Sequence, residues 1–298
     1  MPIIPSGTSL YAPAVAESNG SLAALWTNSA NQQMLLSVYN LNSLSWSVAT
    51  APAGCGSQTR PALAFWNGTF YDVHIGVTGD TKLYTYMTDL AFFPPNPLVV
   101  GPYTSPWIPW TFPFGNSLII TENQQPGQST TQVSYFAFNA DWFGAGQSTL
   151  WSAAATNVTL PNPLTRGACV IVCPTAQGIL WCIVYGQDSS MYHYCCFDQN
   201  WNAGQGEQIP NACPSSFPAV TVYDGNIYAA WVDSVLNASV YSVGTPSAPG
   251  PGISWSAPTT IPGVPTGTTD LSITAGTDGI FVGYCVPNSS LGVVQLGP

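Results

Sequence analysis

The sequence repeats one hairpin-like pattern six times. In each copy a mostly apolar run reaches a polar turn that contains glycine, and a second apolar run follows at once, as in PALAFWNGTFYDVH (61–74) and PAVTVYDGNIYAAW (218–231). The turn glycines, separated by 48, 47, 63, 47 and 54 residues, are Gly20, Gly68, Gly115, Gly178, Gly225 and Gly279. Asn-Gly and Asp-Gly are the strongest signals of a two-residue hairpin turn. Self-similarity at such a period indicates a repeat architecture.

A third strand-like run follows most hairpins after a polar loop. These runs carry tyrosine near the middle and often close on tryptophan: MLLSVYNLNSLSW (34–46), KLYTYMTDLAFF (82–93), TQVSYFAFNADW (131–142), SMYHYCCFDQNW (190–201) and NASVYSVG (237–244). We expect a short fourth strand after the tryptophan. Four strands in each of six repeats of about 50 residues are typical of a six-bladed β-propeller. The second strand of each copy is apolar on both faces, as expected where neighbouring blades cover both sides of a sheet.

The repeats predict a single all-β domain over residues 1–298. The expected blades cover about 9–57, 58–104, 105–163, 164–215, 216–266 and 267–298. The last copy ends at SSLGVVQLGP, after its third strand, so we expect residues 1–8 to supply its outer strand and close the ring. A two-sheet sandwich with accidental similarity among the copies is the alternative.

The composition agrees with strands and limits the partners. Only 5% of residues are charged and 46% are hydrophobic, while Gly 28 and Pro 27 would interrupt most helices. The net charge is −10, and the basic residues are Arg60, Lys82 and Arg166, so no basic surface for nucleic acid can be assembled. No apolar run approaches the ~18 residues of a membrane span, and membrane insertion is not expected. MPIIPSGTSLY has no recognisable signal peptide, so we expect a cytoplasmic location or non-classical secretion.

The cysteines and histidines do not predict a metal centre. Five of the eight cysteines crowd one segment, at Cys169, Cys173, Cys182, Cys195 and Cys196, but no CxxC pair occurs and the chain has two histidines. We expect neither a metal nor another cofactor. The thiols are either reduced and buried in the core, or one or two disulfides form, involving Cys55 or Cys213.

Few side chains could carry catalysis. Neither His74 nor His193 has the sequence context of a nucleophile elbow. A glycosidase needs two carboxylates that face one cleft. Asp72, Glu122 and Asp233 lie near the ends of second strands and are the candidates. The alternative is that these are strand-end carboxylates that accept hydrogen bonds from loop backbone.

Polar and aromatic residues recur where second strands end beside short polar loops. A neutral sugar places its C–H face on an aromatic ring, while amides and carboxylates bind its hydroxyls. Repeated weak sites would give avidity toward multivalent glycans. The predicted ligand-binding residues are Trp26, Asp72, His74, Trp107, Glu122, Tyr185, Asp188, Trp231, Asp233 and Tyr284.

Each aromatic candidate also has a structural interpretation. Trp26, Trp231 and Tyr284 could instead be wedged between blades. Trp107 and Trp110, in SPWIPWTF, replace the small residues found in the other first strands, which favours a role specific to the third blade, with core packing as the alternative.

The six-copy blade, the L-x-Y…W third strand and the very low charge resemble the fungal β-propeller lectins, which include Aleuria-type fucose lectins and Psathyrella-type lectins. This resemblance implies a multivalent lectin with glycans or glycoproteins as partners; oligomerisation stays open. The Arg-and-Glu pair of Aleuria-type fucose sites and the calcium loops of Psathyrella-like repeats are not found in the sequence. We therefore expect a non-enzymatic lectin for neutral glycans. The alternatives are an enzyme with a central-funnel site that uses Asp72, Glu122 and Asp233, either a glycoside hydrolase or a small-molecule lyase or cyclase, and a structural or protein-interaction propeller.

Overall fold

The protein is all-β throughout its described part. The computed structural model describes residues 3–5, 7–18, 20–51, 55–80, 82–88, 98–102, 109–114, 117–123, 131–139, 156–161, 167–201, 206–247, 250–286 and 290–297. These residues form 24 strands and no helix. The search of the described residues for a long, apolar helix that could cross a membrane found none.

The described strands pair into six antiparallel sheets that follow one another along the chain. Sheet 1 contains β1 (Ala14–Ser18), β2 (Ser21–Thr27), β3 (Met34–Asn40) and β4 (Ser45–Trp46). Sheet 2 contains β5 (Ala62–Trp66), β6 (Thr69–Ile75), β7 (Lys82–Thr88) and β8 (Leu98–Pro102). Sheet 3 contains β9 (Trp110–Phe114), β10 (Ser117–Asn123), β11 (Thr131–Asn139) and β12 (Thr156–Leu160).

The second half of the chain is less regular in strand number. Sheet 4 contains β13 (Ala168–Thr175), β14 (Gly178–Gln187), β15 (Ser190–Phe197) and β16 (Glu207–Gln208). Sheet 5 has five strands, β17 (Ala219–Tyr223), β18 (Asn226–Asp233), β19 (Ala238–Ser247), β20 (Gly252–Trp255) and β21 (Thr259–Thr260). Sheet 6 has three described strands, β22 (Asp270–Gly276), β23 (Gly279–Val286) and β24 (Ser290–Leu296).

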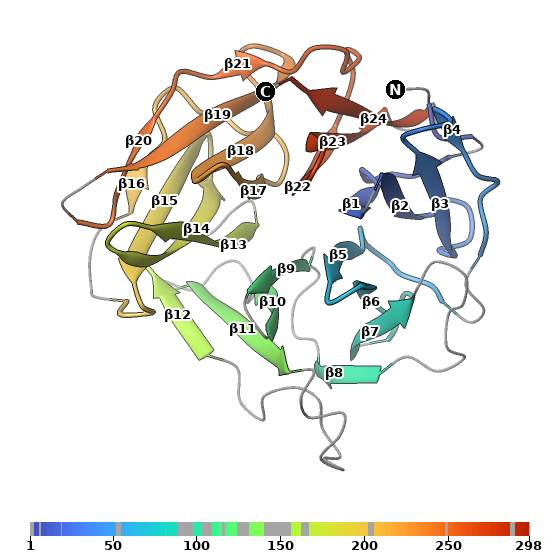
Figure 1. Ribbon diagram of the computed structural model, residues 1–298, viewed down its shortest axis with the longest axis horizontal. Coiled ribbons are helices and arrows are strands. Elements are labelled where there is room, and N and C mark those ends of the chain that lie inside the picture. The colour runs from blue at the N-terminus through green and yellow to red at the C-terminus, as the bar shows by residue number, and fades with distance from the viewer. Residues whose placement is uncertain are drawn as a thin grey trace.

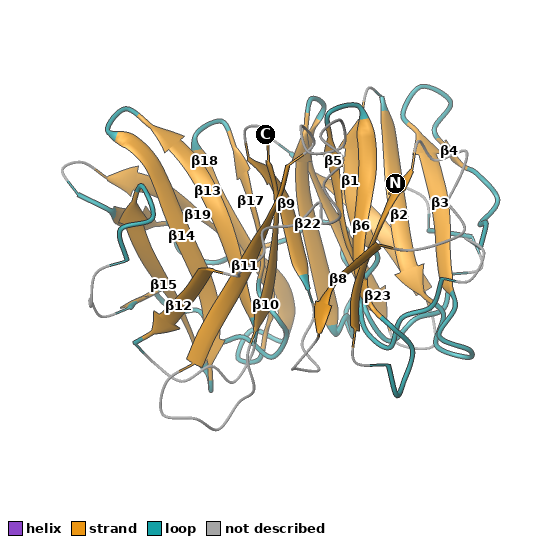
Figure 2. Ribbon diagram, turned by 90° about the horizontal axis from the view of Figure 1, so that it is seen from below, coloured by secondary structure: helices purple, strands orange, loops and turns teal. Residues whose placement is uncertain are grey.

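The first strand of each sheet lies innermost. Figure 1 shows β1, β5, β9, β13, β17 and β22 around a common axis, with the later strands of each sheet farther out, and Figure 2 shows the sheets side on. Each inner strand contacts the next, and β22 contacts β1. This radial order of antiparallel sheets is that of a β-propeller.

The predicted hairpin turns form where the structure describes them, although the glycine does not always hold the same place, and Gly115, the glycine expected in the third turn, lies outside the described residues. Asn67 (φ 48°) with Gly68 (φ 78°), and Asp224 (φ 48°) with Gly225 (φ 71°), have the two positive φ angles of a type I′ turn. In sheets 4 and 6 the turns are at 176–177 and 277–278, and the glycine is the residue after the turn. Using glycine as the anchor therefore misplaced those two copies by one residue.

The core lies between the sheets. In β18, Ala229 and Trp231 pack in the cluster shared with sheet 4, whereas Ala230 and Val232 pack in the cluster shared with sheet 6. Successive residues of a strand point to opposite faces, so a strand covered on both sides must be apolar throughout. All eight cysteines are free thiols, six of them buried, which agrees with reduced core thiols and not with disulfides.

The N-terminal segment contacts the last sheet. The backbone N–H of Ile4 donates to the carbonyl oxygen of Leu291 at 3.0 Å, and Ile3 forms an isolated antiparallel bridge with Gly292 of β24. The Ile4 side chain is 1% exposed and belongs to the core between sheets 6 and 1.

Candidate functional site

A cavity of about 200 Å³ lies on the axis of the ring. Its walls come from the inner strands of all six sheets, because small residues such as Ala14, Ala16, Ala62 and Ala64 leave the centre unfilled. Cavities of this kind at the centre of a radial fold are common places for ligands.

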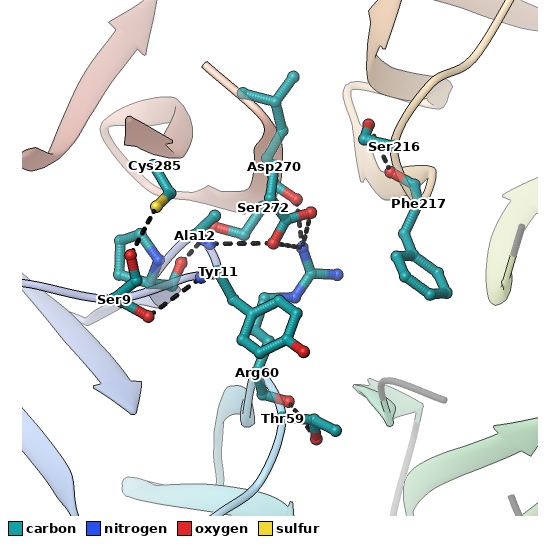
Figure 3. A network of polar contacts seen from close by, with 12 residues as sticks. Ser9, Tyr11, Ala12, Thr59, Arg60, Ser216, Phe217, Asp270, Ser272 and Cys285 are labelled. Carbon is teal, nitrogen blue, oxygen red and sulfur yellow. Dashed lines mark hydrogen bonds and ion pairs between the residues drawn. The ribbon is translucent and has the colours of Figure 1, made fainter. Parts of the chain in front are cut away.

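An ion pair lies at the end of the axis where the inner strands begin. One Arg60 nitrogen, Nη1, is 3.1 Å from both carboxylate oxygens of Asp270 and also donates to the carbonyl of Leu271. Arg60 directly precedes β5 and Asp270 begins β22, so the guanidinium connects sheets 2 and 6, which are separated by sheet 1 (Figure 3). Arg60 is 2% exposed and lines the cavity.

The ion pair is part of a satisfied polar network. The backbone N–H of Ala12 donates to Asp270 at 2.9 Å. Burial raises the pKa of Asp270, while Arg60 and this N–H act against the rise. Burial is the main cause that raises the pKa of Tyr11, and the negative charge of Asp270 raises it further. Ser272 donates to the Pro13 carbonyl (Figure 3). Because Asp270 balances Arg60 and Glu17 adds a carboxylate to the lining, the cavity presents no net positive charge to a ligand.

Aromatic rings and hydroxyls line the cavity. Phe65 and Trp110 contribute rings, and Thr221, Ser272 and Thr274 contribute hydroxyls. The indole Nε1 of Trp110 is buried and has no hydrogen-bond partner in the described part of the chain. A buried donor without a partner is costly, and an acceptor on a bound molecule would satisfy it.

Four predicted aromatic residues are in the core. Trp26, Tyr185 and Trp231 are 0% exposed and Tyr284 is 5% exposed. Their rings fill the spaces between sheets, and Trp231 donates to Asp233 at 2.9 Å. The interpretation of these rings as wedged between blades is the one that the structure supports, and a ring with no exposed face cannot stack on a sugar.

Asp72 and His74 form a buried pair away from the axial cavity. Asp72 Oδ2 is 2.7 Å from His74 Nδ1, and the two residues are 0% and 2% exposed. The His74 ring stacks on Tyr84 with centroids 5.6 Å apart. Tyr84 donates to Asp80 at 2.6 Å, and this hydrogen bond raises the pKa of Tyr84 to about 12. Neither Asp72 nor His74 lines the cavity.

The remaining predicted residues are dispersed. Asp233 is buried and accepts hydrogen bonds from the backbone N–H groups of Cys213, Val235 and Leu236, which is the strand-end carboxylate interpretation. Asp188 is exposed in the turn between β14 and β15.

The last two predicted residues are Glu122 and Trp107. Glu122 lies in β10 opposite Ser134, and Trp107 lies outside the described residues. Neither Asp72 nor Asp233 lines the axial cavity, so the structure does not bring these two carboxylates together there.

The Arg60–Asp270 pair is not among the site residues predicted from the sequence. The available signal was that a chain with only three basic residues keeps one of them directly before a buried strand. A buried arginine requires a carboxylate, but its partner is 210 residues away in sequence.

The sequence matches no family model and no curated protein. Solved structures are similar in fold. A fungal lectin, the Aleuria aurantia lectin with a six-bladed β-propeller fold and a fucose recognition mode, has a TM-score of 0.61 at 12% identity, covering 97% of each chain.

Two enzymes are similar to a comparable degree. The Penicillium chrysogenum α-L-arabinanase complexed with arabinobiose has a TM-score of 0.65 at 15% identity, covering 99% of this chain and 96% of that one. The GH93 α-L-arabinofuranosidase of Fusarium graminearum has a TM-score of 0.62 at 16% identity, covering 96% and 93%. The match to the Aleuria aurantia lectin confirms the architectural resemblance predicted from the sequence. The lectin and the two enzymes together show that the fold of the chain is that of a β-propeller.

Proposed function

We propose that this protein is a non-enzymatic, multivalent lectin that binds neutral glycans. The observation that carries the proposal is the axial cavity, which combines aromatic rings and hydroxyls around a neutralised arginine. Such a lining suits a ligand that is uncharged, rich in hydroxyls and apolar on one face, and a sugar has these properties.

The size of the cavity is adequate for one sugar. A water molecule's share of liquid volume is roughly 30 Å³, so about 200 Å³ holds about seven waters, which limits an occupant to one small sugar. Trp110 would turn its buried N–H toward the cavity and donate it to a sugar oxygen, and the threonine and serine oxygens would accept from sugar hydroxyls.

The proposed framework is a single domain made of a six-bladed ring that the N-terminal segment closes. Six sheets in the described residues, inner strands in mutual contact and the burial of Ile4 against sheet 6 support it.

The state of the described carboxylates favours binding over catalysis. Asp233 accepts backbone hydrogen bonds, Asp270 is paired with Arg60, and Glu17 accepts from the backbone N–H of Thr277 at 2.7 Å. A carboxylate held in this way is poorly placed to attack a sugar or to exchange a proton with one.

A glycoside hydrolase is the second candidate. The similarity to two arabinan-acting propeller enzymes favours it, together with the buried Asp72–His74 pair, whose carboxylate has a nearby proton carrier. Of the acid–base groups predicted from the sequence, Asp72, Glu122 and Asp233, this pair contains Asp72, whereas Asp233 is held by backbone hydrogen bonds.

The two candidates separate in one set of assays. The wild-type protein is applied to a glycan array and to erythrocytes, and it is incubated with arabinobiose, arabinan, xylan and glucan while released sugar is measured. The lectin proposal expects array binding without sugar release. Sugar release supports the hydrolase, and a folded protein that neither binds nor cleaves contradicts both.

The axial cavity is tested with Trp110→Phe, which keeps a ring and removes the N–H. Loss of one hydrogen bond, worth about 0.5–1.5 kcal/mol, should weaken binding by roughly 2- to 12-fold. Trp46→Phe on the outer strand β4 is the matched control and should leave affinity unchanged.

A further inference from the structure

Three tyrosines lie in a row on the face of sheet 5 that is turned toward sheet 6. Tyr223 ends β17, Tyr228 is in β18 and Tyr241 is in β19. The ring centroids of Tyr223 and Tyr228 are 6.5 Å apart with planes at 71°, and those of Tyr228 and Tyr241 are 6.4 Å apart with planes at 19°. All three side chains are half-buried. We call this set the tyrosine row.

The strand register places the three rings on one face. Tyr223 is opposite Asn226, and Asn226 and Tyr228 are two residues apart in β18. Tyr228 is opposite Val243, which is two residues from Tyr241 in β19. Side chains at spacings of two share a face of a sheet, so the row crosses three adjacent strands.

The equivalent pair in sheet 2 is covered. Trp66 and Tyr71 occupy the same places relative to their hairpin turn, their centroids are 5.5 Å apart, and each is 5% exposed. In the described part of the chain sheet 5 has five strands and its neighbour, sheet 6, has three. The sheet 5 face packs on Leu271 and Val282 of sheet 6, and the three tyrosines pack against the same cluster while staying half-buried.

Polar groups continue this face beyond the rings. Thr245 Oγ1 donates to Asn226 Oδ1 at 2.8 Å, and both side chains lie on the same face as Tyr228. No hydrogen-bond partner among the described residues is found for the three phenol hydroxyls. Asp224, in the adjoining turn, is exposed and would repel anionic ligands. The face therefore offers rings, hydroxyls and an amide without a cation.

We propose that the tyrosine row binds a linear, neutral oligosaccharide, with two successive sugar units on the nearly parallel rings of Tyr228 and Tyr241 and a third against Tyr223, whose ring plane is at 71° to that of Tyr228. The proposal rests on the proposed lectin function and names a second site and its ligand class, separate from the axial cavity. Aromatic faces stack on the C–H faces of sugars, and phenol, amide and hydroxyl groups bind the sugar hydroxyls. A single sugar contacts one ring, so affinity at this site depends on chain length.

The test titrates the full-length protein calorimetrically with neutral oligosaccharides of one to six units from arabinan, xylan and glucan. For the class that binds, we expect affinity to rise at least tenfold from one unit to three and to change little beyond four. Tyr241→Ser should abolish most of this gain, whereas Tyr241→Phe, which keeps the ring, should lose about threefold or less.

Two further variants keep the test decisive. Tyr192→Ser, in the third strand of sheet 4, is the matched control, because the ring that stacks on Tyr192 is that of Tyr185, which is fully buried. Tyr223→Ser, at a strand end, replaces Tyr241→Ser if that variant unfolds. Affinity that is independent of chain length, or chain-length dependence that survives both row substitutions, overturns this site. If the tyrosine row fails in this way but Trp110→Phe still weakens sugar binding, the axial site and the proposed function remain supported. A wild-type protein that binds no probe contradicts the proposed function itself.

Discussion

Replacing Ile4 by alanine should destabilise the protein if the N-terminal segment closes the ring. Ile4 is 1% exposed and packs with Leu22, Phe281 and Leu291 at the junction of sheets 6 and 1. Buried isoleucine-to-alanine changes cost about 2–5 kcal/mol, through lost burial and the cavity left behind. We take about 3 kcal/mol for this site, because a short terminal segment can partly relax into the space.

The expected shift in Tm follows from the size of the chain. Unfolding entropy of about 2.1 cal/mol/K per residue gives roughly 0.6 kcal/mol/K for 298 residues, so 3 kcal/mol lowers Tm by about 5 °C. Deleting residues 1–8 also removes the Ile4–Leu291 backbone hydrogen bond and should lower Tm by several degrees as well, at least as far as Ile4→Ala.

Thermal unfolding followed by circular dichroism or calorimetry measures this effect. Ile3→Ala is the matched control, because Ile3 is the adjacent residue and is 57% exposed. Surface substitutions usually stay within about 0.5 kcal/mol, so the control should shift Tm by less than about 1 °C. Equal Tm values for the wild type and Ile4→Ala would refute the ring-closure argument.

Three other substitutions or treatments have defined outcomes. Burial lowers the pKa of His193, and the Trp255 indole donates a hydrogen bond to its Nδ1 at 3.1 Å, so the folded state favours the neutral ring. The Tm should therefore fall as the pH drops below the ordinary histidine pKa of about 6.5. His193→Gln should flatten this dependence between pH 7 and 5.5. An unchanged pH slope in that variant would contradict the assignment. Asp233→Ala leaves several donors without their acceptor and should cost about 3 kcal/mol, or about 5 °C in Tm, with Asp278→Ala, at an exposed turn residue, as the neutral control. Burial raises the pKa of Cys169 and of Cys285 to about 12 each, so a disulfide reagent at pH 8 should label them only after unfolding, and rapid labelling of both in the native protein would be inconsistent with this packing.

The hairpins could be predicted from sequence because their signals are local. Asn67-Gly68 and Asp224-Gly225 adopt the positive φ angles that such pairs favour. The alternation of side chains along β18 likewise reports that both faces are covered. The turn at 277–278, Thr-Asp before Gly279, is less regular, and local rules placed it one residue late.

The site could not be predicted because burial depends on neighbouring sheets. Trp231 and Tyr241 are both aromatic residues on adjacent strands of sheet 5, yet one is fully buried and the other is half-buried. What separates them is which face of the sheet they occupy and which residues pack against that face, and neither property is written in the local pattern. The Arg60–Asp270 contact depends in the same way on ring closure between distant segments.

The central claim, that the propeller binds neutral glycans at more than one site without cleaving them, is tested most directly by calorimetric titration of the wild-type protein. The titrant is the strongest neutral oligosaccharide from the array, and it is recovered and sized afterwards. We predict a stoichiometry above one sugar chain per protein chain and an intact ligand. A single site with a shortened ligand, or no heat of binding from any neutral glycan, would contradict the claim.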